Sequence, residues 1–433
     1  MPTIAAHTLG CKVNQYDTQA MLELFQEAGY QVVPMAQEAD VYLINTCTVT
    51  ETGDRKSLQL ARKIRREHPG SRLILCGCLA QKQGAALLEA VEADLVIGVQ
   101  RRSEVVALLR QTEENRKPLC AVEPLSGDIP YEALDISFQS EHTRATLKIQ
   151  EGCDNRCTYC IIPSVRGPVR SRPPESIRRE AACLAAKGYR EVVLTGIHLS
   201  SYGRDLAGGL GLLDAVRIVQ ETEGILRIRL GSLEPRIATE DFARALRAFD
   251  KVCPQFHLAL QSGSDTVLRR MKRQYNAAQY LEGVRHLREA FPDAAFTTDV
   301  LTGFPGETEA EYQETREMIR KVGFARIHVF PYSARPDTPA ATMPGQLSRA
   351  EKDRRTRELI ALGKESAEAY ERSWLNRDAI LLPEEAAEGR WEGYTPEYIR
   401  VRLPAGVEAT CGTPVRIKLV SVHPGYMDGE IIE

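Results

Sequence analysis

The 433-residue chain lacks a long hydrophobic run, an export signal and a strong charge of either sign. Its longest apolar runs, such as 41–44, 73–76 and 379–382, are far shorter than the roughly 20 residues of a membrane span. Residues 1–10 show no signal-peptide pattern, so we expect a cytoplasmic protein. The net charge of −3 excludes a basic field over the whole molecule, and any nucleic-acid surface must be local.

The sequence also lacks internal repeats, low-complexity tracts and a complete dinucleotide-binding motif. The Gly-x-Gly at 209–211 has no third glycine at the required interval, so it does not predict a dinucleotide site. Hydrophobic residues make up 43% and charged residues 27%, which is typical of globular proteins and excludes disorder. At about 150 residues per domain, the length predicts three domains.

Eleven cysteines, an odd number without an export signal, predict a reducing compartment and free thiols. Isolated cysteines are usually small core residues, and we expect this of Cys120, Cys183, Cys253 and Cys411. The other seven fall in four places: Cys11; Cys47; Cys76 and Cys78; and Cys153, Cys157 and Cys160.

Residues 1–115 alternate short apolar strands with amphipathic helices. Strands are expected at Thr3–Leu9, Val41–Asn45, Arg72–Cys76 and Asp94–Ile97, and helices at Gln15–Ala28, Lys56–Glu67, Gln81–Val91 and Ser103–Glu113. This alternation predicts an α/β domain with a parallel sheet. Cys11, Cys47 and the Cys76–Cys78 pair follow three strand ends. Because ligands bind at the carboxyl edge of such sheets, we expect three thiols to converge there.

After a polar linker at 116–142, residues 143–374 contain six further strand–helix units and a trailing helix. Their strands are expected at Ala145–Gln150, Glu191–Leu194, Leu226–Leu230, Phe256–Leu260, Phe296–Leu301 and Arg326–Phe330. Six units predict a partial, TIM-like (β/α)6 barrel, with its chemistry at the carboxyl ends of the strands. Short strands broken by proline and glycine, at Ala379–Leu382, Tyr398–Leu403, Val415–Val420 and Gly429–Ile432, predict a small C-terminal β-barrel at 375–433.

The triplet Cys153-x-x-x-Cys157-x-x-Cys160 follows the first strand of this partial barrel directly. Three thiolates on one tight loop suit three irons of a 4Fe–4S cluster. A structural zinc site, the alternative, needs a fourth close ligand, and the nearest candidate, His142, lies upstream across a strand. A missing fourth ligand leaves one iron open to a substrate or cofactor, as catalytic metal sites require.

The triplet and its position resemble the radical S-adenosylmethionine (SAM) superfamily. The resemblance implies that SAM binds the open iron and is cleaved by one electron to a 5′-deoxyadenosyl radical. Such a radical can break unactivated C–H bonds, which acid–base catalysis cannot. It also implies SAM contacts at the strand ends, where glycine allows close approach and polar side chains orient a ligand. We expect these contacts from Thr195, Gly196, Ser232, Gln261, Ser262, Asp299, Gly303 and Phe330, the last packing on adenine.

Three N-terminal segments, 8–17, 45–49 and 76–81, resemble the methylthiotransferases within that superfamily. This resemblance implies a second 4Fe–4S cluster on Cys11, Cys47 and Cys78, facing one cavity with the first. The family pattern Gly-Cys-x-Ala-Gln selects Cys78 over Cys76, which spacing alone leaves open. Asn14 and Asp17 could support this site, or they could act only as caps of the following helix.

The family resemblance also implies the substrate and partners. Its members modify adenosine beside the tRNA anticodon, carrying an isopentenyl or a threonylcarbamoyl group, or an aspartate of a ribosomal protein. The N-terminal segments look most like the subgroup that converts N6-threonylcarbamoyladenosine to its 2-methylthio form, with SAM as methyl donor and radical source. We expect as partners the tRNA anticodon stem-loop, a reductant such as flavodoxin or ferredoxin, and a sulfur donor. A non-catalytic iron–sulfur RNA-binding protein is the remote alternative.

Local basic runs at 62–66, 166–172 and 269–273 agree with an RNA partner, although each could equally be a solvated face. We expect the second run to meet phosphate beside the cysteine loop. The C-terminal barrel resembles the RNA-binding TRAM domain. Residues 377–433 nevertheless contain six Lys and Arg against ten Asp and Glu. RNA binding there would need a local face, formed by Arg400, Arg402, Arg416 and Lys418.

Overall fold

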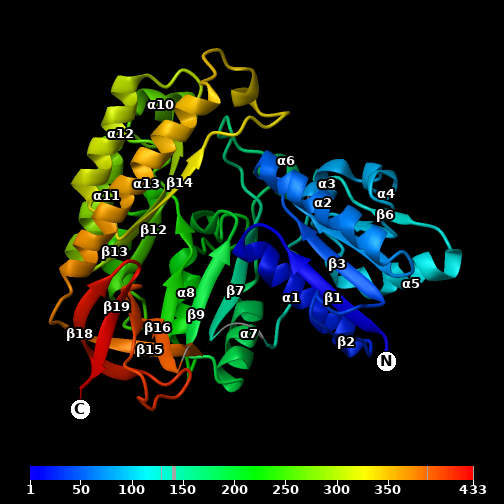
Figure 1. Ribbon diagram of the computed structural model, residues 1–433, viewed down its shortest axis with the longest axis horizontal. Coiled ribbons are helices and arrows are strands. Elements are labelled where there is room, and N and C mark those ends of the chain that lie inside the picture. The colour runs from blue at the N-terminus through cyan, green and yellow to red at the C-terminus, as the bar shows by residue number, and fades with distance from the viewer. Residues whose placement is uncertain (128, 139–142, 388, 433) are drawn as a thin grey trace.

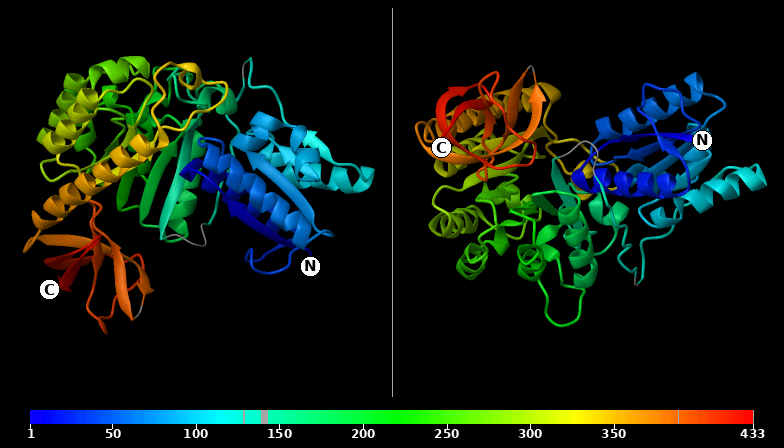
Figure 2. Two further views of the ribbon diagram at one scale, coloured as in Figure 1. Left: turned by 45° about the horizontal axis from the view of Figure 1, so that its top comes forward. Right: turned by 90° about the horizontal axis from the view of Figure 1, so that it is seen from below.

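The structure, a computed structural model, describes residues 1–127, 129–138, 143–387 and 389–432. Three units follow one another along the chain, and the central barrel lies between the N-terminal sheet and the C-terminal barrel (Figure 1). Both turned views show the same arrangement, with the N-terminal and C-terminal units on different sides of the central barrel (Figure 2). No helix in the described part of the chain is long and apolar enough to cross a membrane.

The N-terminal unit is a six-stranded parallel sheet covered by helices on both faces. In spatial order its strands are β2 (Gln31–Val32), β1 (Thr3–Thr8), β3 (Val41–Thr46), β4 (Arg72–Gly77), β5 (Leu95–Ile97) and β6 (Leu119–Ala121). Its helices are α1 (Lys12–Glu27), α2 (Glu51–Glu67), α3 (Cys78–Gln83), α4 (Ala86–Ala90), η1 (Arg102–Glu104) and α5 (Val105–Asn115). The central strand β3 is buried along its whole length because apolar clusters cover both faces of the sheet.

Two details differ from the prediction for this unit. The helix expected at 81–91 is two short helices, because Gly84 ends α3 with a positive φ of 52°. Strand β6 lies within the expected linker and pairs with β5. The sheet therefore continues past residue 115.

The central unit contains the six expected parallel strands, divided between two sheets. The first sheet runs β10 (Arg227–Leu230), β9 (Glu191–Gly196), β7 (Arg144–Glu151) and the short antiparallel β8 (Arg170–Ser171). The second runs β11 (Ser232–Leu233), β12 (Gln255–Leu258), β13 (Ala295–Thr302) and β14 (Arg326–Pro331). An isolated bridge joins Ile228 of β10 to Val252, which precedes β12, and the division into two sheets agrees with the predicted partial barrel.

Helices pack outside these strands and enclose the largest apolar core of the molecule. They are α7 (Pro174–Ala186), η2 (Leu199–Ser201), α8 (Leu212–Gln220), η3 (Pro235–Ile237), α9 (Glu240–Arg247), α10 (Asp265–Arg270), α11 (Ala277–Ala290) and α12 (Glu309–Val322). Two further short helices lie outside this core: α6 (Ile162–Arg166) packs on Cys78, and η4 (Pro339–Thr342) packs in a separate cluster with Phe304. The long helix α13 (Arg349–Arg372) packs along β14 and leads to the C-terminal unit.

The C-terminal unit is a closed five-stranded barrel, as predicted. Its strands are β15 (Asp378–Ala387), β16 (Arg390–Tyr394), β17 (Arg400–Arg402), β18 (Val415–His423) and β19 (Tyr426–Ile431). The sequence pattern missed β16. Among the four isolated cysteines, Cys253 is buried and Cys120 and Cys183 are half-buried, but Cys411 is exposed, which makes the core prediction wrong for Cys411.

Candidate functional site

The loop that follows β7 holds three cysteines in a tight turn. Gly152 begins it with a φ of +73°, and a Cβ there would lie 1.8 Å from the Pro168 carbonyl oxygen, so only glycine fits. The Cys153 amide donates to the Gly167 carbonyl at 3.0 Å, and the Cys160 amide donates to the Cys157 carbonyl at 3.1 Å. The loop is therefore held at Cys153 by the residue that follows α6, and in its middle by the Thr158 amide, which donates to the Met271 carbonyl at 3.1 Å.

All three of these thiols line one cavity of about 150 Å³, together with Tyr159, His198, Ser232 and Arg273. The Arg273 guanidinium donates to Cys157 Sγ at 3.3 Å. Burial raises the pKa of Cys153 to about 11 and that of Cys160 to about 12. The three thiols are therefore partly shielded from water, and the guanidinium of Arg273 lies beside one of them, Cys157.

The other three predicted thiols meet at the carboxyl edge of the N-terminal sheet. Cys11 caps α1, Cys47 follows β3, and Cys78 begins α3, and their strands β1, β3 and β4 are neighbours in register. A Cβ on Gly10 would lie 3.1 Å from Cys47 Sγ, so the turn before Cys11 presses against Cys47. Three residues far apart in sequence thus share one edge.

The Asn14 side chain holds this edge together. Its amide donates to the Leu9 carbonyl at 2.8 Å and to the Thr46 carbonyl at 3.1 Å, the residues just before the two cysteine turns. Asn14 therefore supports the loops that carry Cys11 and Cys47.

The structure distinguishes the two cysteines of the Cys76-Gly-Cys78 segment. Cys76 lies in the apolar core between α1 and the sheet and is fully buried. Cys78 faces the central barrel, packing on Ile161 and Val165 of the α6 region. Burial raises the pKa of Cys78 to about 11, with Arg166 opposing and with Cys11 and Cys47 contributing in the same direction. Cys78 is therefore the one that accompanies Cys11 and Cys47.

Arg166 connects the two thiol sets. It ends α6, the helix that directly follows Cys160, and its guanidinium is completely buried. Its Nε donates to Cys78 Sγ at 3.1 Å, and its Nη2 donates to Asn14 Oδ1. The same guanidinium pairs at 2.9 Å with Glu151, which precedes the cysteine loop. One side chain thus contacts both cysteine-bearing regions.

Arg166 belongs to a buried ionic network between the N-terminal unit and the central barrel. The Lys148 ammonium lies 2.6 Å from both Asp17 and Glu151, and Arg102 pairs with Asp17. Burial by itself would raise the pKa of the Asp17 carboxyl, but the neighbouring cations outweigh this effect, and the pKa is lowered. Asp17 is thus part of the domain interface, where buried charges persist because each one is paired.

The cavity beside the loop cysteines is not lined by Cys11, Cys47 or Cys78. This cavity therefore does not reach the second thiol set, and α6 with Arg166 contacts both cysteine-bearing regions. Within the described residues, no three His, Cys, Asp or Glu side chains could hold one metal ion. His142 lies outside the described residues. Cluster thiolates bind separate irons and need not converge on one point, so both thiol sets suit 4Fe–4S clusters better than zinc.

The predicted SAM-contact residues are distributed over several strand ends, and Ser232 is the one that lines the cavity. Ser262 is fully buried, with its hydroxyl 3.2 Å from that of Thr315. Asp299 lies 3.3 Å from His257, and Phe330 is 48% exposed. The remaining four, at strand ends or in turns, are Thr195, Gly196, Gln261 and Gly303. The sequence pattern indicated only that Arg273 belongs to the basic run 269–273, and it did not predict that Arg273 lines the cavity beside Cys157.

The expected phosphate contact by the run 166–172 is wrong. Arg166, Arg170 and Arg172 are all buried, and Arg172 pairs with Asp135 and Glu180 inside the protein. Guanidinium groups with internal partners are not available to RNA. In the C-terminal barrel, Arg400 and Arg402 both pair with Glu392, which reduces the basic face expected there.

Comparison with known proteins agrees with this architecture. Residues 147–319 match the Radical SAM superfamily, and residues 3–98 match the uncharacterized protein family UPF0004. The chain is 41% identical to threonylcarbamoyladenosine tRNA methylthiotransferase MtaB of Bacillus subtilis, covering 100% of this chain and 97% of the relative. It is 36% identical to tRNA-2-methylthio-N(6)-dimethylallyladenosine synthase of Frankia alni, covering 98% and 88%.

A solved structure shares the fold. The radical SAM methyltransferase TsrM of Kitasatospora setae superposes with a TM-score of 0.59 at 14% identity, covering 78% of this chain and 77% of that one. A partial barrel with three cysteines after its first strand, matched to that superfamily, defines a radical SAM enzyme, with SAM and 4Fe–4S clusters as cofactors. Within this class, the chain belongs to the methylthiotransferase family.

Proposed function

We propose that this enzyme converts N6-threonylcarbamoyladenosine beside the tRNA anticodon to its 2-methylthio derivative, using SAM as methyl donor and radical source. The 41% identity over the whole chain to the Bacillus subtilis relative, named for that nucleoside, carries the proposal. The Frankia relative is named for dimethylallyladenosine, which makes N6-isopentenyladenosine in tRNA the second candidate. Because the proposed substrate is tRNA, we place the reaction in the cytoplasm.

We propose that Cys153, Cys157 and Cys160 hold one 4Fe–4S cluster. The cavity beside them offers the Ser232 hydroxyl and the Arg273 guanidinium, and an arginine suits the carboxylate of SAM. A 4Fe–4S cluster with SAM supplies a radical that removes hydrogen from unactivated C–H bonds. The half-buried walls of the cavity limit the access of water to that chemistry.

A second cluster is proposed on Cys11, Cys47 and Cys78. Asn14 ties the first two turns together, and Arg166 donates to the third thiol, so these residues would orient the ligands. The functional domains proposed are 1–115 extended to include β6, the barrel with its trailing helix at 143–374, and the C-terminal barrel at 375–433. A reductant protein and a sulfur donor complete the proposed partners.

Anaerobic reconstitution followed by assay on two tRNA substrates tests the proposal. Purified protein should hold about eight irons and should modify threonylcarbamoylated tRNA but not isopentenylated tRNA. Zinc as the sole bound metal, or product only on the isopentenylated tRNA, would contradict it. In the source organism, deletion of the gene should remove 2-methylthio-threonylcarbamoyladenosine from total tRNA.

A further inference from the structure

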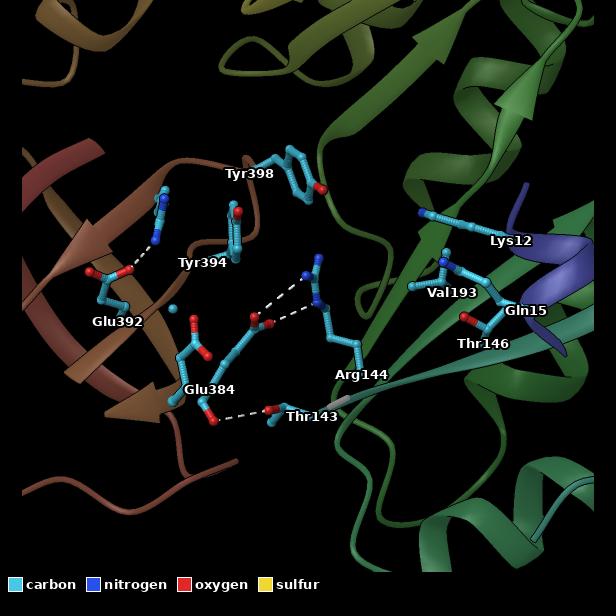
Figure 3. Close-up of a pocket in the computed structure, with 13 residues that line it drawn as sticks. Lys12, Gln15, Thr143, Arg144, Thr146, Val193, Glu384, Glu392, Tyr394 and Tyr398 are labelled. Carbon is cyan, nitrogen blue, oxygen red and sulfur yellow. Dashed lines mark hydrogen bonds and ion pairs between the residues drawn. The ribbon is translucent and has the colours of Figure 1, made fainter. Parts of the chain in front are cut away.

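A cavity of about 360 Å³ lies where the three units meet, at the end of β7 opposite the cysteine loop (Figure 3). Its walls come from α1, from β7 and β9, and from the β15, β16 and β17 region of the C-terminal barrel. Its lining includes Lys12 and Gln15 of α1, Arg144 of β7 and Glu385 of β15.

The cations on the C-terminal side of this cavity already have partners. Arg144 pairs with Glu384 at 2.7 Å, and its guanidinium lies 4.8 Å from the Tyr394 ring centre. Arg400 pairs with Glu392. The Tyr394 and Tyr398 rings stack, with their centres 4.8 Å apart, and form a flat wall. These charges are therefore neutralised within the protein.

Lys12 differs from them. Its exposed side chain extends from α1 into the cavity, toward Tyr398 (Figure 3), and it forms no hydrogen bond or ion pair with the described residues. Glu385 also lines the cavity, from β15, but it does not pair with Lys12. An anion placed beside Lys12 would pair with an ammonium that has no carboxylate partner among the described residues.

Gln15 stands beside Lys12 on the same face of α1. Residues three apart on a helix are neighbours, and Val13, Asn14, Tyr16 and Asp17 occupy the buried faces. The Gln15 side chain has no hydrogen-bond partner among the described residues. An ammonium and an amide, both unpaired, thus face the same space.

We propose that Lys12 and Gln15 bind the N6 side chain of the substrate nucleoside, Lys12 its carboxylate and Gln15 its carbamoyl group. This inference rests on the proposed function, because only the threonylcarbamoyl substrate carries a carboxylate there. Lys12 directly follows Cys11, so the same turn of α1 would hold both the substrate side chain and a cluster thiolate. An isopentenyl group offers no partner to the ammonium, so Lys12 is a specificity-determining residue.

Binding of three anticodon stem-loops to the reconstituted enzyme tests this proposal. The RNAs carry threonylcarbamoyladenosine, its carboxylate methyl ester, or unmodified adenosine, and dissociation constants are measured anaerobically by fluorescence anisotropy. The wild-type enzyme should bind the free carboxylate about 10- to 100-fold more tightly than the ester, the range of one charge-assisted hydrogen bond. Lys12→Gln should bring this ratio close to one, and Lys12→Arg should keep most of it.

Arg400→Gln is the matched control, because it removes a cation from the same cavity that is already paired. It should leave the carboxylate-to-ester ratio as in the wild type. A wild-type ratio in Lys12→Gln would overturn the proposal, and an equal loss for all three RNAs would identify a phosphate as the anion and overturn it too. If the wild-type enzyme itself shows no preference and modifies only isopentenylated RNA, the proposed function fails instead.

Discussion

The two thiol sets of this enzyme are built in opposite ways. Cys153, Cys157 and Cys160 lie on one short loop. Cys11, Cys47 and Cys78 come from three strand ends and meet only because those strands are neighbours in the sheet. The cysteines of the first set are close together because they are close in the chain, whereas those of the second are close only when the whole sheet has folded.

Each set also has one arginine that donates to a thiol, and the surroundings differ: Arg166 is fully buried, whereas Arg273 is half-buried. Arg166, on Cys78, is held by Asp17 and Glu151 in the domain interface. Arg273, on Cys157, pairs with no carboxylate among the described residues and lies against the Tyr275 ring at 4.9 Å. Arg166 therefore stabilises the domain interface as well as contacting the Cys78 thiol. Arg273 contacts the Cys157 thiol and lines the cavity, but it belongs to no ionic network among the described residues.

Removing one cysteine from each set should have the largest effect and should separate their roles. Cys157→Ala and Cys47→Ala should each lower the iron content from about eight to about four per chain. Cys157→Ala should abolish 5′-deoxyadenosine formation, whereas Cys47→Ala should retain it and lose methylthio transfer. Iron analysis and product chromatography measure both. Loss of SAM cleavage in Cys47→Ala would show that the two sites are not independent.

Arg166→Gln should have the next largest effect, on stability. Removing one partner of a buried ionic network costs about 3–5 kcal/mol, because Asp17 and Glu151 then lose a counter-charge. Denaturant unfolding of the apoprotein measures this loss, and iron analysis should show a deficit in the N-terminal set. Unchanged stability would show that Lys148 and Arg102 alone satisfy the two carboxylates.

Arg273→Gln should affect the loop set with a smaller loss of stability. We expect about 1–3 kcal/mol, the range for hydrogen bonds to charged groups. Because hydrogen bonds and positive charge favour a reduced cluster, the potential of the loop cluster should become more negative. Redox titration followed by electron paramagnetic resonance checks this shift, and the signal of the other cluster should not move. A shift in both signals would contradict the assignment.

Cys76→Ala should have the smallest effect. The substitution removes one buried sulfur from an apolar core and should cost about 1 kcal/mol. Iron content should stay at about eight per chain, while Cys78→Ala as the paired variant should lose about four. The opposite pattern would mean that Cys76 is the ligand.

The strand–helix alternation predicted most of the fold, because periodic burial is a local property of each segment. The prediction failed where non-local contacts decide. Strand β6 is only three residues long and exists because β5 offers it a partner edge, and β16 forms because the barrel must close. The helix at 81–91 is broken at one glycine whose conformation the periodicity does not reveal.

The candidate site divides in the same way. The triplet spacing placed three thiols on one short loop, although backbone hydrogen bonds of Thr158 with Met271 and Ala340 also hold that loop to the barrel. Spacing left the choice between Cys76 and Cys78 open, and the tertiary structure shows why they differ: Cys76 lies on β4 in the apolar core, whereas the chain turns at Gly77 (φ 90°) and Cys78 begins α3, facing the barrel. It also decided that Arg166 is buried against a thiol while Lys12 faces an open cavity. The sequence does not show whether a charged residue is buried, because burial depends on which parts of the chain pack against that residue.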